Sequence, residues 1–140
     1  MCGFLAKISK SKNSEELLSK KDFESAAKVI AHRGPDFNSI IHLDNGTSFA
    51  HYRLSIIDNT NNSDQPYISK CGRYILTFNG EIYNYKYLAN KYFPKVLVKG
   101  DTETLMLLLI KYDINKFLSE IEGMFSFVFF DKFTNYFVAA

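Results

Sequence analysis

The start of the chain has a pattern of apolar and polar residues that predicts a strand followed by a helix. Residues 3–8 (GFLAKI) are typical of a short strand. Four apolar residues then recur at i, i+3, i+4 and i+7, namely Phe23, Ala26, Ala27 and Ile30. This spacing places them on one face of a helix. Residues 31–36 (AHRGPD) indicate its end, with Gly34 in the left-handed position and Pro35 preventing continuation.

A β-hairpin is predicted next, and its turn carries a strong sequence signal. Residues 39–43 (SIIHL) and 48–54 (SFAHYRL) are strand-like and flank the pair Asn45-Gly46. Asn-Gly favours the tight turn that joins two antiparallel strands. Residues 58–66 (DNTNNSDQP) are mostly polar and predict a surface loop after the hairpin.

The second half of the chain alternates strands with helices. Strands are expected at residues 73–78, 95–99, 124–130 and 135–140, and helices at about residues 83–93 and 102–112, with further helix to about Glu122. Residues 124–130 (MFSFVFF) are apolar on both alternating faces, and a strand of this kind is covered on both sides. We therefore expect an α/β protein in which a sheet lies between two other layers.

Composition narrows the class of protein and its environment. The chain has 140 residues, 46% hydrophobic and 16% aromatic, which suits one globular domain. Lys and Arg number 17 against 15 Asp and Glu, so the basic face of a nucleic-acid-binding protein is missing. No apolar run has membrane-spanning length. Two cysteines, Cys2 and Cys71, make no disulfide framework, and a cytoplasmic location is expected.

Cys2 is the first candidate for chemistry because it directly follows the initiator methionine. A thiol with a pKa near 8.5 needs a base before it acts as a nucleophile. If Met1 is removed, the α-amine of Cys2, with a pKa of about 7.7–8.0, can be that base. The alternative base is a histidine, but none of the three, His32, His42 and His51, belongs to a recognisable Cys–His motif.

Four further residues carry polar groups that suit a small amide substrate. Asn79 and Gly80 could donate a side-chain and a backbone N–H to a developing oxyanion, or form a simple turn after a strand. Arg53 could hold a carboxylate with two hydrogen bonds, or form a surface ion pair. Asp101 could bind an ammonium group, or cap the start of a helix. Residue types and spacing alone leave these alternatives open.

Seven motifs give the chain a resemblance to a known family. In order they are MCGF (1–4), HRGPD (32–36), RLSIID (53–58), QP (65–66), FNGEIYN (78–84), GDTE (100–103) and GMFSFVFFD (123–131). Over essentially its whole length the chain resembles the glutamine-hydrolysing N-terminal domain of asparagine synthetases, a class II glutamine amidotransferase with an N-terminal nucleophile. The resemblance implies a four-layer αββα sandwich of the N-terminal-nucleophile hydrolase type, in which two mainly antiparallel sheets lie between helices.

The same resemblance assigns the catalytic groups to Cys2, Asn79 and Gly80. Cys2 would attack the side-chain amide of glutamine while its own amine moves the proton. Ammonia would leave, a glutamyl thioester would form, and water would release glutamate. Asn79 and Gly80 would stabilise the negative oxygen. No metal and no cofactor are expected in this chain.

The substrate-binding residues implied by the resemblance hold the two charged groups of glutamine. Arg53 would bind the carboxylate, while Glu81 and Asp101 would bind the ammonium group. Backbone groups that follow the arginine would line the same pocket, at Leu54, Ile56 and Ile57. Residues 32–36 (HRGPD) are assigned a structural role as a helix end and turn.

The chain also departs from the family pattern. The family continues beyond residues 135–140, so residues 1–140 are expected to be a glutaminase domain incomplete at its C-terminus. A synthetase domain is absent from this sequence, and with it the residues that would bind ATP and magnesium. Asparagine synthesis from aspartate would therefore belong to the full-length enzyme. Glutamine and the synthetase domain are the expected partners, and a homodimer is a candidate assembly.

Three other interpretations stay open at this point. The domain could supply ammonia for the amidation of a sugar or a peptide in place of aspartate. Another class II amidotransferase, such as the enzyme that makes glucosamine 6-phosphate, shares the Met-Cys-Gly start and an Asn-Gly pair, but not the motifs HRGPD, LSIID and NGEIYN together. A non-catalytic structural or regulatory domain is the alternative from a different class.

Overall fold

The computed structural model describes residues 2–9, 18–54 and 64–140, and it contains both helices and strands. The strands are β1 (Gly3–Lys7), β2 (Phe37–His42), β3 (Ser48–Arg53), β4 (Tyr67–Ile68), β5 (Tyr74–Ile82), β6 (Gly123–Asp131) and β7 (Phe137–Ala139). The α-helices are α1 (Lys20–Val29), α2 (Tyr85–Tyr92) and α3 (Asp101–Lys111). Short 3₁₀ helices are η1 (Ala31–Arg33), η3 (Ile114–Lys116) and η4 (Leu118–Glu120). The expected α/β class is confirmed.

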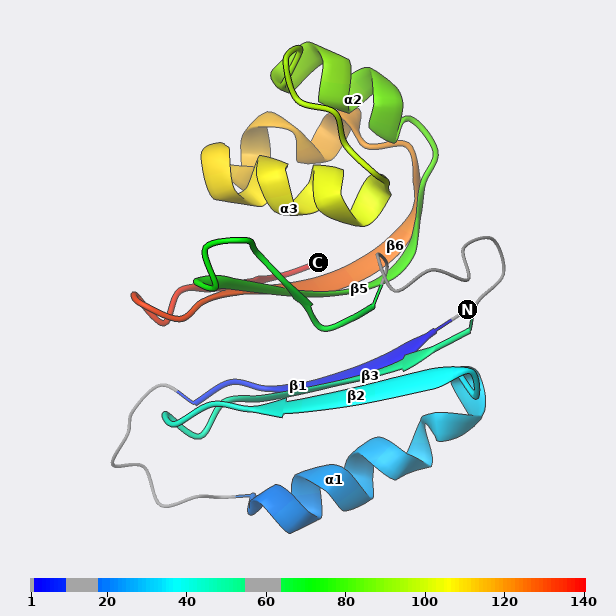
Figure 1. Ribbon diagram of the computed structural model, residues 1–140, viewed down its shortest axis with the longest axis vertical. Coiled ribbons are helices and arrows are strands. Elements are labelled where there is room, and N and C mark those ends of the chain that lie inside the picture. The colour runs from blue at the N-terminus through cyan, green and yellow to red at the C-terminus, as the bar shows by residue number, and fades with distance from the viewer. Residues whose placement is uncertain (1, 10–17, 55–63) are drawn as a thin grey trace.

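The strands form two antiparallel sheets that lie face to face (Figure 1). The first sheet has the strand order β1-β3-β2, and the second has the order β4-β5-β6-β7. Helix α1 lies on the outer side of the first sheet, whereas α2 and α3 lie on the outer side of the second (Figure 1). No helix in the described ranges is long and apolar enough to cross a membrane.

The first sheet contains the predicted hairpin, made by β2 and β3. Its turn uses Asn45, whose Oδ1 accepts the backbone N–H of Thr47 at 3.0 Å, and Gly46, whose φ is 84°. β1 pairs antiparallel with β3, from Gly3 opposite Tyr52 onward. This pairing brings the start of the chain beside the end of β3, which is the feature that positions Cys2.

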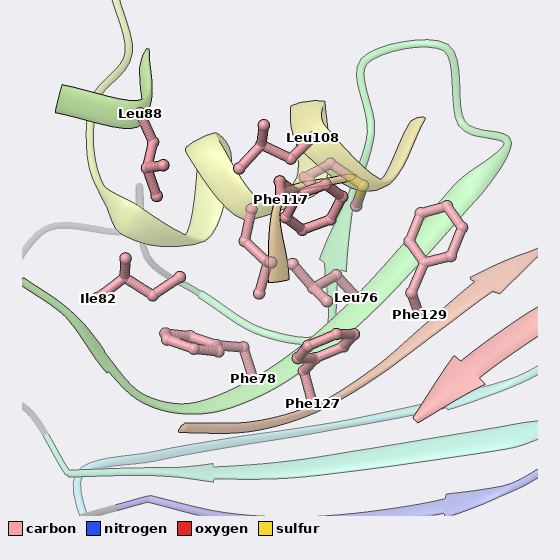
Figure 2. Close-up of a cluster of buried hydrophobic side chains, with 10 residues drawn as sticks. Leu76, Phe78, Ile82, Leu88, Leu108, Phe117, Phe127 and Phe129 are labelled. Atoms are coloured by element: carbon pink, nitrogen blue, oxygen red, sulfur yellow. The ribbon is translucent and has the colours of Figure 1, made fainter. Parts of the chain in front are cut away.

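The second sheet is built on β5 and β6, which pair along their whole length. Side chains alternate between the two faces of a strand. One face packs beneath the helices, and Figure 2 shows the buried side chains there, among them Leu76, Phe78, Leu108, Phe117, Phe127 and Phe129. The other face meets the first sheet, where Phe49 packs with Ile75 and Phe130. The prediction of a strand covered on both sides is confirmed for β6, apart from the exposed Met124 at its start.

The strand predicted at residues 95–99 is wrong, because this segment forms no strand. It follows Pro94 and begins in a turn that the N–H of Val96 closes on the carbonyl of Phe93 at 2.9 Å. Leu97 is 95% exposed. A short apolar run needs a neighbouring strand to complete its backbone hydrogen bonds, and this segment has no paired strand beside it in the described sheets.

The segment after α3 also differs from the prediction of continuous helix to about Glu122. The backbone of Tyr112 is extended, with φ −132° and ψ 151°, so α3 ends at Lys111. Asp113 then accepts the N–H of Asn115 at 2.9 Å and starts η3. An Asp at this position competes with helix continuation because its side chain caps a new turn.

Candidate active site

Cys2 directly precedes β1, at the end of the first sheet where β3 also ends. The backbone N–H of Leu54 donates to the Sγ of Cys2 at 3.4 Å, and the thiol lies 3.9 Å from the carbonyl oxygen of the same residue. Cys2 is partly buried. Main-chain groups just after β3 therefore hold the thiol at a fixed place beside the strand end.

The turn at residues 32–36 (HRGPD) ties the ends of β1 and β3 together. The Nε of Arg33 donates to the carbonyl of Cys2 at 3.1 Å. The backbone N–H of Asp36 donates to the carbonyl of Arg53 at 3.1 Å. The turn thus contacts Cys2 and Arg53, two of the residues that were expected to act on substrate. These contacts are consistent with the structural role assigned to the motif.

Gly34 is required in this turn for a reason other than the one predicted. Its φ is −152°, so the expected left-handed conformation is wrong. A Cβ at this position would lie 2.2 Å from the carbonyl carbon of Tyr52, far inside any van der Waals contact. Only glycine lets the turn approach β3 this closely.

Arg53 is the last residue of β3 and is buried, with 8% of its surface exposed. Its Nη1 donates to Oδ1 of Asp64 at 3.0 Å. A buried guanidinium needs charged or polar partners, because removal from water is unfavourable. The surface ion pair considered from the sequence is therefore wrong, and the charge sits inside the protein next to Leu54. Ile56 and Ile57, expected to line the same pocket, lie outside the described residues.

Asn79 lies inside β5, because this strand continues to Ile82 and does not end in a turn before it. Strand alternation places its side chain on the face toward the first sheet, the face that Ile75 also uses. The Oδ1 of Asn79 is buried and has no hydrogen-bond partner among the described residues. Such an acceptor costs about 1–3 kcal/mol when left unpaired. Buried unsatisfied groups are rare in native proteins and some mark catalytic sites.

Gly80 is fixed by the close approach of β6. Its φ is 149°, a value that side chains rarely adopt, and an added Cβ would lie 2.1 Å from the carbonyl oxygen of Met124. The strand can pass this point only with glycine. The Asn-Gly pair therefore combines a buried amide with a backbone that no other residue could form.

Glu81 and Asp101 come close together through the backbone of β5. The Oδ2 of Asp101 accepts the N–H of Ile82, the residue after Glu81, at 3.2 Å. Its Oδ1 accepts the N–H of Thr102 at 2.7 Å. Gly100, not Asp101, is the N-cap of α3, so the predicted capping alternative is wrong in detail. Asp101 instead joins the start of α3 to the end of β5, while Glu81 is exposed.

The predicted site residues thus form two groups, one on each sheet. Cys2, Arg53 and Leu54 gather at the end of the first sheet. The second sheet contributes Asn79, Gly80 and Glu81 from one strand, with Asp101 tied to its end. In Figure 1 the N-terminus and the part of β5 that leads to α2 lie at the same end of the layers.

Two residues that sequence analysis gave no role hold the backbone of Phe78, and one of them, His51, connects the two groups. The Nε2 of His51, on β3, lies 3.3 Å from the carbonyl oxygen of Phe78, on β5. The Oε1 of Gln65 accepts the N–H of Phe78 at 2.6 Å. Both contacts fall one residue before Asn79. Gln65 was visible in the sequence as part of the motif QP, and His51 lies two residues before Arg53, but neither position indicated a contact with the backbone of Phe78.

The electrostatics of His51 show that its ring is neutral. Burial lowers its pKa from 6.5 to about 4, with a smaller lowering by Arg53. Since a carbonyl can only accept a hydrogen bond, Nε2 carries the proton, and Nδ1 is a buried acceptor without a partner among the described residues. The other two histidines have hydrogen-bond partners other than the thiol. His32 contacts the carbonyl of Val29, and His42 contacts the side chains of Ser48 and Glu24.

Comparison with known proteins identifies the family of the chain. A family model described as a glutamine amidotransferase domain matches residues 1–140. The chain is 35% identical over 141 residues to the glutamine-hydrolyzing asparagine synthetase 2 of Oryza sativa subsp. japonica, covering 100% of this chain and 23% of the relative. The glutamine-hydrolyzing asparagine synthetase 2 of Bacillus subtilis (strain 168) is 34% identical over 136 residues. The match covers 96% of this chain and 18% of that protein.

Asparagine synthetase B of Escherichia coli (strain K12), also named as glutamine-hydrolyzing, is 34% identical over 116 residues, or 82% of this chain and 20% of that protein. The chain therefore spans at most about a quarter of the length of these curated relatives. The family model, in contrast, covers every residue of the chain. The chain belongs to the glutamine amidotransferase domain family.

Proposed function

We propose that this domain hydrolyses the side-chain amide of glutamine, with Cys2 as the nucleophile after removal of Met1. One observation carries the proposal: the thiol of Cys2 is held by the backbone of Leu54, the residue that follows the buried Arg53. A nucleophile held at the end of a strand that also carries a buried cation suits a small substrate with an anionic group. Membership of the amidotransferase family supports the choice of glutamine.

The base in this proposal is the α-amine of Cys2, because the histidines have other partners. With a pKa of about 7.7–8.0, a free α-amine is partly neutral at pH 7 and can accept the thiol proton. Sγ bonds to the amide carbon, and the carbonyl electron pair moves to oxygen. When the intermediate collapses, the C–N bond breaks, the amine returns the proton to nitrogen, and ammonia leaves. Water then attacks the thioester and releases glutamate.

The oxyanion in this mechanism would be stabilised by Asn79 and Gly80. The side-chain NH₂ of Asn79 and the backbone N–H of Gly80 are donors of the type that oxyanion holes use. The close packing of Gly80 against β6 supports the assignment, since a rigid backbone keeps its donor aimed without reorganisation. We also infer that the fold is of the N-terminal-nucleophile hydrolase type, with four layers.

Substrate selection would rest on the charged groups at both sheet ends. Arg53 would bind the α-carboxylate, while its contact with Asp64 holds the guanidinium in place. Glu81 and Asp101 would bind the α-ammonium group. The backbone at Leu54, Ile56 and Ile57 would line the pocket between these charges. An uncharged simple amide would miss both ion pairs, which is how the site would prefer an amino acid.

In the full-length protein, we infer that the ammonia serves ATP-dependent synthesis of asparagine from aspartate. The printed names of the curated relatives support this, since they are glutamine-hydrolyzing asparagine synthetases. A C-terminal synthetase domain would then hold ATP and magnesium, and this chain would need no cofactor of its own. A cytoplasmic location and a homodimer belong to the same proposal.

The experiment that tests the function is a glutaminase assay on the full-length protein, with mass spectrometry of its N-terminus. Wild-type protein should release glutamate only in the form that lacks Met1. Cys2→Ala should lose this activity, whereas Cys71→Ala should keep it, because Cys71 is exposed on a turn of the second sheet. Glutaminase activity in Cys2→Ala, or in protein that retains Met1, would overturn the mechanism.

A further inference from the structure

The backbone of Phe78 is unusual within β5, because both of its hydrogen-bonding groups are bound by side chains. Phe78 pairs with Phe127 in the ladder, but the N–H and carbonyl of Phe127 bond to Ala140, at 2.7 and 3.2 Å. Phe78 must therefore direct its own groups away from β6, as in every non-hydrogen-bonded antiparallel pair. Its partners are the Oε1 of Gln65 at 2.6 Å and the Nε2 of His51 at 3.3 Å.

Gln65 occupies the place where β4 would continue. β4 pairs with β5 at Tyr67 opposite Leu76, and two residues further along each strand Gln65 falls opposite Phe78. The main-chain ladder has ended there, so the side-chain amide takes over the hydrogen bond of a strand. Gln65, His51 and Phe78 are all buried. This three-residue arrangement, the Phe78 clamp, is thus enclosed, and His51 links it to the first sheet.

The clamp acts on the peptide that leads into Asn79. The carbonyl bound by His51 belongs to the same planar unit as the N–H of Asn79. When both ends of the Phe78 backbone are held, the direction from which the Asn79 side chain leaves the strand is fixed. Asn79 forms no side-chain hydrogen bond through its Oδ1 in the described part of the chain, so the backbone is what determines its aim.

We propose that His51 and Gln65 are positioning residues of the glutaminase site, which aim the amide of Asn79 at the oxyanion by holding the backbone of Phe78, His51 from the first sheet and Gln65 from the segment before β4. The inference rests on the proposed function. His51 also shares β3 with Arg53, two residues away and on the same face. The clamp therefore sets the distance between the part of the site that binds the carboxylate and the part that meets the oxygen.

This role makes His51 a hydrogen-bond donor and not a base. Its ring is neutral because burial lowers its pKa to about 4, and its proton is committed to the Phe78 carbonyl. A glutamine side chain also ends in an N–H donor of similar reach, whereas leucine has none. The pair His51→Gln and His51→Leu therefore separates the hydrogen bond from the volume of the side chain.

The test is steady-state glutaminase kinetics on the full-length protein with these two variants and Gln65→Met. His51→Leu and Gln65→Met should lower kcat by about 10–100-fold, as small misplacements of catalytic groups do. KM for glutamine should change by less than about threefold, since the oxygen is charged only in the transition state. His51→Gln should recover most of kcat.

His42→Leu is the matched control, because His42 is also hydrogen-bonded, to Ser48 at 2.8 Å and Glu24 at 3.1 Å, but packs against α1. It should lower stability without lowering kcat. A folded His51→Leu protein with wild-type kcat would overturn the inference, as would a failure of His51→Gln to exceed His51→Leu. If His51→Leu does not fold, Gln65→Met with unchanged kcat overturns it instead.

Failure of the inference is distinguishable from failure of the proposed function. If wild-type protein shows no Cys2-dependent release of glutamate, the proposed function itself is wrong, and the inference falls with it. If wild-type and His42→Leu hydrolyse glutamine through Cys2 while His51→Leu and Gln65→Met match them in kcat, the function stands and only the clamp is rejected.

Discussion

The two ends of the β5–β6 ladder are both rich in buried polar groups, yet they are built in opposite ways. At the start of β5, Arg73 donates from Nε and Nη2 to the two carboxylate oxygens of Asp131 at 2.7 and 2.6 Å. The same carboxylate accepts the N–H of Phe133 and the hydroxyl of Thr134. The hydrogen bonds from Arg73 hold the pKa of Asp131 well below its usual range.

At the other end of the ladder, buried acceptors remain unused. Within the described residues, the Oδ1 of Asn79 and the Nδ1 of His51 have no hydrogen-bond partner. Satisfied networks stabilise a fold, whereas unsatisfied buried groups are retained where a substrate or catalytic step needs them. We therefore expect the Arg73 end to maintain the ladder, whereas under the proposed function the Asn79 end takes part in catalysis.

The largest effect should come from Asn79→Ala. Loss of one oxyanion donor lowers kcat by about 10²–10³-fold, or roughly 3–4 kcal/mol. Stability should be unchanged or slightly higher, because a buried unpaired acceptor is removed. Glutaminase kinetics and urea unfolding measure the two effects, and Asn38→Ala on the exposed part of β2 is the control. A large loss of stability with normal kcat would place Asn79 in the same structural class as Asp131.

Asp131→Ala should show the reverse behaviour. The substitution removes a nearly buried carboxylate that binds Arg73. We expect the free energy of unfolding to fall by about 2–3 kcal/mol. This loss is smaller than for a fully buried ion pair, because Arg73 is partly solvated. The folded fraction should keep the wild-type kcat. Asp113→Ala, which removes only an exposed cap, should cost about 1 kcal/mol. If kcat falls in Asp131→Ala, the two ends of the ladder are coupled.

Arg53 shares features with both ends of the ladder. It has a hydrogen-bond partner, as Asp131 has, and it is a proposed substrate-binding residue in the same site as Asn79. Arg53→Ala should raise KM for glutamine by about 10–100-fold, because a charge-assisted hydrogen bond is worth about 1.5–3 kcal/mol. Arg53→Lys should recover only part of the affinity, since an ammonium cannot form the two-bond fork. Circular dichroism checks folding. An unchanged KM in folded Arg53→Ala would remove Arg53 from the pocket.

The smallest effect should be a pH dependence of stability caused by His51. Its pKa is about 4 in the folded protein and 6.5 in an unfolded chain, so the unfolded chain binds more protons between these limits. Stability should therefore fall with decreasing pH, by about 2 kcal/mol from pH 7 to pH 5. Arg53 and Asp64 also act on the ring, in opposite directions.

The measurement is urea unfolding of wild-type and His51→Gln protein across this range, with circular dichroism as the signal. The variant should lose this component of the pH dependence because glutamine does not titrate. Asp131, with its lowered pKa, contributes a loss only at lower pH, where the carboxylate becomes protonated. Identical slopes for the two proteins between pH 5 and 7 would show that His51 does not carry the effect.

The sequence predicted the parts of the fold that local patterns determine. Asn45-Gly46 defined the hairpin, and the apolar residues of β6 defined a strand buried on both faces. It could not predict that residues 95–99 have no strand beside them, because pairing depends on the rest of the sheet. It also misplaced the end of β5, since Gly80 suggests a turn until its contact with β6 is known.

The candidate site shows the same division. Cys2, Arg53 and Asn79 were identified by residue type and resemblance, and the structure puts Cys2 and Arg53 at one end of the first sheet and Asn79 within β5 of the second. The contacts of His51 and Gln65 with Phe78 were not predicted. They join residues 27 and 13 positions apart in the sequence, and no local periodicity encodes contacts over such separations.

The order of strands has a consequence for how such a domain can change during evolution. The first sheet uses only β1 to β3, and the second uses only β4 to β7, so among the described strands none crosses from one half of the chain to the other. The proposed nucleophile belongs to one half and the Asn-Gly pair to the other. A substitution within one sheet should therefore have little effect on the structure of the other sheet, except at residues where the two sheets contact each other. Contacts such as His51 with Phe78 are the points at which the two halves must change together or not at all.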